Sequence, residues 1–137
     1  MTSFLALGPL LLGVSACAVT VTIFSPTTTN TYLVGSKVSG SGKCTWGAGE
    51  HAANQVMLWT LVGSGDPSQG TSVDNQFAMM TLYPPNPDGS GASSWTTQTL
   101  DDLLAPAAKG PFFFTAVAYN SLMGSLGAFA TVQVSAY

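Results

Sequence analysis

Short segments in which apolar and polar residues alternate recur along this chain after residue 18, and clusters of turn-forming residues separate them. Alternation with a period of two puts the apolar side chains on one face of a β-strand, so each segment can cover one side of a core. About seven short strands joined by turns are typical of an all-β sandwich, in which two antiparallel sheets face each other. The predicted strands are residues 19–23, 38–46, 55–62, 77–83, 93–100, 112–119 and 128–135.

Residues 55–62 form the most continuously apolar of these segments, which is expected of a central strand covered on both faces. Helical character is limited to residues 99–109, where Pro106 allows at most one short helix near residues 100–105. No repeat or linker divides residues 19–137, which are therefore predicted to be one domain. The predicted core consists of Val56, Leu58, Phe77, Met79, Leu82, Phe112, Phe114, Ala116, Ala118, Val132 and Val134.

The N-terminal residues form a separate apolar segment that carries no charged side chain up to residue 23. An apolar run followed by the small residues Ala16-Cys17-Ala18 is typical of a secretory signal, so residues 1–18 are interpreted as a signal peptide. Three alternatives stay open: a lipoprotein cleavage box ending at Cys17, an uncleaved membrane anchor, and a hydrophobic arm that stays with the protein.

A retained arm would include Val19, Val21 and Ile23, which alternate with threonine and are the candidate assembly segment. The edge of a sheet has unpaired backbone groups and can accept a further strand. These residues are therefore expected to pair with a sheet edge in their own domain or in a neighbouring one.

The low charge of the chain excludes several classes of partner. Charged residues make up 7% of the sequence, and lysine and arginine together number three, which leaves a formal net charge of −3. Nucleic acid binding requires many cationic side chains that neutralise phosphates, so no nucleic acid partner is expected. Contact with a membrane is expected only through the N-terminal segment, because no polybasic patch exists. A polar but uncharged surface fits a secreted or cell-surface protein, or a virion component.

No group of residues has the spacing of a catalytic or metal-binding motif. Acid–base catalysis requires two titratable groups with separated pKa values in one cleft, and Glu50-His51 is the only adjacent acid–histidine pair. Two cysteines and one histidine are too few for a zinc site, and the acids lack the spacing of a calcium loop. The chain is therefore expected to be non-enzymatic, without cofactor or metal. Cys44 is expected either to pair with a retained Cys17 or to be a buried free thiol.

Three aromatic residues are candidates for stacking on a carbohydrate ring: Trp46, Trp95 and Tyr83. Trp46 adjoins a glycine-rich stretch and is expected to be the best exposed of them. The competing interpretation is that Trp95 packs between the sheets and that Trp59 belongs to the core.

The C-terminal part of the chain carries a recognisable motif. Residues 110–120 read Gly-Pro-Phe-Phe-Phe-Thr-Ala-Val-Ala-Tyr-Asn, which resembles the penultimate strand of bacterial-type immunoglobulin-like domains, G-x-Y-x-L-T-A-x-A-x-D. Residues 23–26 and 37–42 resemble the opening pieces of that family. The resemblance covers about residues 19–137 and implies an immunoglobulin-like β-sandwich with a surface or extracellular role. Phe112 replaces the family's tyrosine and lacks the hydroxyl of a tyrosine corner.

The leading hypothesis is a non-enzymatic structural or adhesive surface protein that acts through protein–protein contacts and self-assembles through a sheet edge or the N-terminal arm. The first alternative is a secreted carbohydrate-binding module, and the second is a virion or phage accessory protein.

Overall fold

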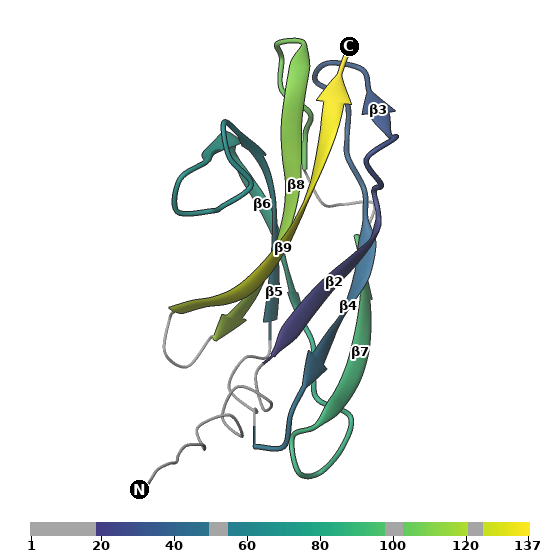
Figure 1. Cartoon of the computed structure of the whole chain (residues 1–137), viewed down its shortest axis with the longest axis vertical. Helices are drawn as coiled ribbons and strands as arrows, with labels where there is room; N and C mark the ends of the chain where they lie inside the picture. The colour runs from purple at the N-terminus through teal and green to yellow at the C-terminus, as the bar shows by residue number, and fades with distance from the viewer. Residues whose placement is uncertain (1–18, 50–54, 98–102, 121–124) are drawn as a thin grey trace, which may run out of the picture.

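Two β-sheets face each other in the computed structural model, which describes residues 19–49, 55–97, 103–120 and 125–137 (Figure 1). The three-stranded sheet has the order β2-β4-β7, formed by Thr20–Ser25, Ser41–Trp46 and Gly91–Thr96. The five-stranded sheet has the order β3-β9-β8-β5-β6. Its strands are Thr31–Tyr32, Ser125–Ala136, Gly110–Asn120, Gln55–Val62 and Thr71–Thr81. The predicted all-β, immunoglobulin-like sandwich is therefore confirmed.

Each of the seven predicted strands corresponds to one of these strands, and β3 is additional. The chain leaves the three-stranded sheet after Ser25 and joins the other sheet at β3, which runs parallel to the end of β9. The other strand pairs among the described residues are antiparallel. The parallel pair was not predicted, because a strand of two residues is too short to show alternation.

The core lies between the sheets and is centred on β5 and β8. Val56, Leu58, Phe112, Phe114 and Ala116 are completely buried, as predicted. Burying a side chain the size of leucine or phenylalanine contributes about 1.5–3 kcal/mol, so these two strands supply much of the stability of the domain. The prediction that β5 is a central strand covered on both faces is confirmed, because it lies between β6 and β8 and residues of both its faces are buried.

The predicted core is wrong in β6. Phe77 and Met79 are 49% and 42% exposed, whereas Met80 packs against the core and Leu82 is buried. Both faces of this strand carry large apolar residues, so alternation alone does not decide which face is turned inward. Val132 in β9 is half-buried rather than fully buried.

No helix is present in the described part of residues 100–105. Leu104 instead forms an isolated β-bridge with Lys37, and the neighbouring Leu103 carbonyl accepts a hydrogen bond from the Val38 amide. Residues 100–102 and the predicted signal segment, residues 1–18, lie outside the described residues. Over the described residues, the structure has no helix that is long and apolar enough to cross a membrane.

Candidate functional site: surfaces available for contact

The three predicted stacking residues do not form one exposed site. Trp46 and Trp95 are 5% and 3% exposed, so the expectation that Trp46 presents its ring to solvent is wrong. The alternation of β4 explains the burial of Trp46, because it has the same parity as Gly42 and Cys44, which also face the core. Tyr83 is 70% exposed and lies beyond the end of β6.

Trp95 packs between the two sheets, so the alternative to carbohydrate stacking that was given for this residue is the correct one. Its ring stacks on Phe114 of β8 with a centroid distance of 6.3 Å and an interplanar angle of 19°. Two glycines make room for this pair: a β-carbon on Gly42 would meet the Trp95 ring, and one on Gly40 would meet Phe114. Among the described residues, the Trp95 Nε1 atom is a buried side-chain donor with no hydrogen-bond partner.

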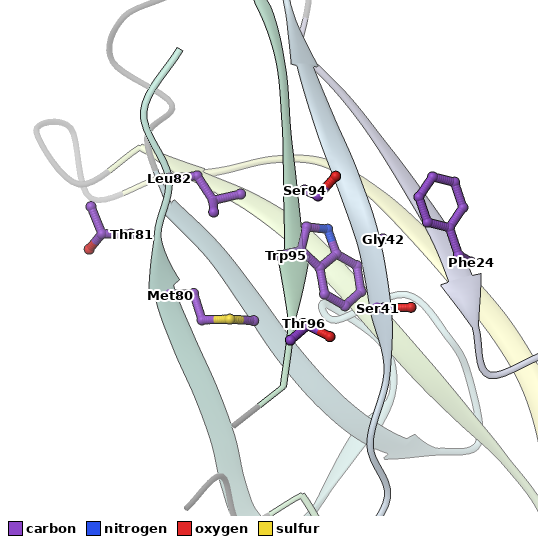
Figure 2. A pocket seen from close by; sticks show the side chains of 9 residues that line it. All are labelled: Phe24, Ser41, Gly42, Met80, Thr81, Leu82, Ser94, Trp95 and Thr96. Atoms are coloured by element: carbon purple, nitrogen blue, oxygen red, sulfur yellow. The ribbon is translucent and has the colours of Figure 1, made fainter. Parts of the chain in front are cut away.

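A groove of roughly 610 Å³ opens beside this tryptophan. It is lined by three residues of β7 and by residues from the ends of β2, β4 and β6. Figure 2 shows Met80 and Leu82 on one side of the Trp95 ring and Phe24 on the other. The remaining lining residues are Ser41, Gly42, Thr81, Ser94 and Thr96. The groove therefore combines apolar surface with hydroxyl groups and holds no charged side chain.

The candidate assembly segment is part of the domain's own sandwich. Val21 and Ile23 lie in β2, where they pair with Cys44 and Gly42 of β4. Together with Val19 they are half-buried and pack against the core. Among the described residues, β2 is an edge strand of the three-stranded sheet and pairs with β4 on one side only.

An exposed apolar surface that the sequence did not predict crosses the outer face of the five-stranded sheet. The pairing of the strands aligns Met79, Met57, Val117 and Phe129 in one row across β6, β5, β8 and β9. The next row holds Phe77 and Trp59, whose rings contact edge to face at 6.3 Å. We call these six residues the apolar patch.

The centre of the apolar patch is buried, whereas its ends are exposed. Val117 is completely buried, but Phe129, Met79 and Phe77 are between 42% and 49% exposed. Clusters of exposed apolar side chains on a soluble domain are typical of contact surfaces.

The loop after β5 covers the adjoining part of the same outer face. Thr115 donates a hydrogen bond from Oγ1 to the Gly65 carbonyl at 2.8 Å, and a β-carbon on Gly65 would meet the Thr131 side chain. Thr115 is completely buried by this arrangement. The outer face is thus covered in part by this loop, and Phe77, Met79 and Phe129 of the apolar patch stay exposed on it.

Asp66 and Asp88 have turn-forming roles. The Asp66 carboxylate accepts hydrogen bonds from the Ser68 hydroxyl and amide, which lower the pKa of Asp66. Asp88 accepts the same pair of bonds from Ser90. No cluster of three potential metal ligands occurs among the residues that the structure describes. Glu50-His51 lies outside them.

Cys44 is a buried free thiol in the described structure, and Cys17 lies outside it. Burial raises the pKa of the Cys44 thiol to about 11. A thiol of this kind is a poor nucleophile at neutral pH, so its contribution is that of a small apolar side chain.

No known protein family matches this chain, and no curated protein matches it in sequence. Among solved structures, one that is similar is the ASH / PapD-like domain of human CEP192 (PapD-like domain 7). It is 11% identical over 85% of this chain and 82% of that chain, with a TM-score of 0.31. So distant a likeness supports no inference about a partner.

Proposed function

We propose that this protein is a non-enzymatic structural or adhesive protein that acts through protein–protein contact, and that its apolar patch binds the same patch on a second copy. The observation that carries the proposal is the row of apolar side chains across four strands, open at Met79 and Phe129. Both the row and the adjoining Trp59–Phe77 pair consist entirely of uncharged residues. A surface of this kind is complementary to itself, because apolar contact requires no opposite charge on the partner.

The exposed area indicates a weak association. An aromatic side chain buries about 150–250 Å² when it is fully covered, so three large side chains that are nearly half exposed leave about 250 Å² uncovered on each copy. Covering both copies would contribute about 12 kcal/mol at 25 cal/mol per Å². Association costs about 4–15 kcal/mol in lost motion, so at most about 8 kcal/mol is left and we expect a dissociation constant of about 1 micromolar or weaker.

Two finer assignments belong to the same proposal. The motif of residues 110–120 forms β8, which supports kinship with bacterial-type immunoglobulin-like domains. The scarcity of charge and the signal-like segment of residues 1–18 support a secreted or cell-surface location.

The test is to place a charge in the apolar patch and measure association. Met79→Lys would bury an unpaired ammonium group between two copies, which is strongly unfavourable, so self-association should fall below detection. Leu33→Lys is the matched control, because Leu33 is 56% exposed and follows β3, which pairs with the opposite end of β9 from Phe129. Sedimentation velocity of both variants and the parent chain measures the effect. Equal association of the Met79 variant and the parent would refute the proposal.

A further inference from the structure

The smaller sheet leaves one side of the sandwich uncovered. Among the described residues a sheet of three strands faces a sheet of five, and β2 lies against β8 and β9 at one side. The groove beside Trp95 lies at the other side, where Met80 and Leu82 extend from the end of β6 toward the Trp95 ring (Figure 2). Met80 is only half-buried there. The groove therefore occupies the place that a fourth strand beside β7 would take.

The backbone of β7 is open on the side of the groove. Within the described residues β7 pairs only with β4, in a register without a bulge. The Thr97 amide donates to the Gly40 carbonyl at 2.9 Å, and these two residues continue that register by one pair. In an antiparallel ladder, residues whose backbone groups face the partner strand alternate with residues whose backbone groups face away from it. The residues whose amides and carbonyls face the open edge are therefore Ala92, Ser94 and Thr96.

The side chains of the groove define which strand fits beside β7. Ser94 and Thr96 contribute hydroxyl groups, whereas Met80 and Leu82 contribute apolar surface. In an added strand, residues opposite Ser94 and Thr96 would lie beside those hydroxyls, and the residues between them would be turned toward Met80 and Leu82. None of the described residues that line the groove is charged, so a charge on its apolar side would be buried without a partner. The groove therefore fits a strand in which apolar residues alternate with serine or threonine.

We propose that the open edge of β7 and the groove beside it bind an extended, uncharged segment of a partner protein, in which apolar residues alternate with serine or threonine. The segment pairs antiparallel with β7 and turns its apolar side chains toward Met80 and Leu82. In binding of this kind, main-chain hydrogen bonds supply affinity and the alternate side chains supply specificity. The site is separate from the self-association proposed above, because the apolar patch lies on the outer face of the other sheet.

Hydrogen exchange of the full chain tests the proposal, with the capped peptide Gln-Thr-Val-Thr-Leu-Thr-Gln as the probe. The amides of Ser94 and Thr96 face the open edge, so at saturating peptide we expect both to exchange at least about tenfold more slowly. The amides of Ser93 and Trp95 face β4 and should keep their rates, which makes them the internal control.

Two N-methylated forms of the peptide show which of its edges contacts the protein. Methyl groups on the second and third threonines remove the amides that face β7, so this form should not bind. Methyl groups on the valine and the leucine remove amides that face away from β7, so this form should bind as the unmodified peptide does. Both measurements use the parent chain and depend on no variant.

A pair of variants at Thr96 tests the same contact from the protein. Thr96→Pro removes an amide that faces the open edge, which an edge strand tolerates, and should weaken peptide binding about tenfold. Thr96→Val is the matched control, because it removes the hydroxyl and keeps the amide, and it should bind within about threefold of the parent. An unchanged far-UV spectrum shows that each variant has folded.

Four outcomes would overturn the proposal. Slow exchange at Ser94 and Thr96 before peptide is added would show that the edge is already covered. Equal binding of the two N-methylated peptides, or of the two Thr96 variants, would show that the β7 backbone does not make the contact. Chemical-shift changes confined to Met79 and Phe129 would assign the peptide to the apolar patch. No binding of the unmodified peptide at millimolar concentration would exclude the site.

Discussion

Substituting alanine for Gly40 is expected to destabilise the domain strongly, because the core has no room for a methyl group there. A β-carbon at this position would lie 2.5 Å from Cζ of Phe114 and 2.6 Å from the Ser25 carbonyl oxygen. Carbon atoms in contact are normally about 3.5–4.0 Å apart. The Phe114 ring is fully buried and stacked on Trp95, so it cannot turn away without breaking that contact.

The magnitude follows from these two contacts. Adding a methyl group to a well-packed core costs typically about 1–3 kcal/mol, and Gly40→Ala should lie near 3 kcal/mol because one of the contacts is with backbone. Gly35→Ala is the comparison: Gly35 has φ +73° but no atom within 4 Å of the added carbon. It should cost only about 1–2 kcal/mol, from the left-handed conformation alone.

Equilibrium unfolding in urea measures both losses, and a double variant identifies their origin. Phe114→Leu shortens the side chain that Gly40→Ala would meet, so the pair should lose less stability than the sum of the two single variants. The coupling should be incomplete, because the Ser25 oxygen remains in place. A cost of Gly40→Ala no larger than that of Gly35→Ala, or strict additivity with Phe114→Leu, would refute this account of the packing.

Two further predictions concern buried polar groups. Burial raises the pKa of Cys44 to about 11, so the neutral thiol is the form favoured by folding. The contribution of the neutral Cys44 thiol to the free energy of unfolding is fully present below about pH 9, and it is lost as the pH rises through 11. The free energy of unfolding should therefore fall by about 2–3 kcal/mol more in the parent than in Cys44→Ala over this interval, and equal falls would contradict the assignment. Thr115→Val removes the 2.8 Å hydrogen bond to the Gly65 carbonyl and should cost about 1–2 kcal/mol in thermal or urea unfolding, whereas a neutral effect would show that the loop is not held by this bond.

The strands could be predicted from the sequence because alternation is a local signal. Gln55–Val62 and Gly110–Asn120 carry it strongly, and both form central strands. The inward face of β6 could not be predicted, because Phe77 and Met79 are as apolar as Met80 on the opposite face. Its position at the edge of the sheet leaves the outer side chains uncovered.

The exposure of Trp46 was predicted wrongly from the glycines that follow it. The parity of β4 was the better signal, because Trp46 is two residues beyond the buried Cys44.

The apolar patch could not be predicted from any one segment. It depends on the register of four strands, which brings Met79 and Phe129 into one row from positions 50 residues apart in the sequence. Sequence alternation defines the faces of a strand but does not define which residue of another strand lies beside it.

The methionine methyl groups allow the most direct measurement of contact through the apolar patch. Met79 lies in the patch, and Met80 lies next to it on the opposite, core-facing side of β6. In a chain labelled with ¹³C at the methionine methyl groups, raising the protein concentration from micromolar to millimolar should shift the Met79 signal and leave that of Met80 in place. A Met79 signal that does not move over this range, or one that moves no more than that of Met80, would contradict the claim that the patch is the contact surface.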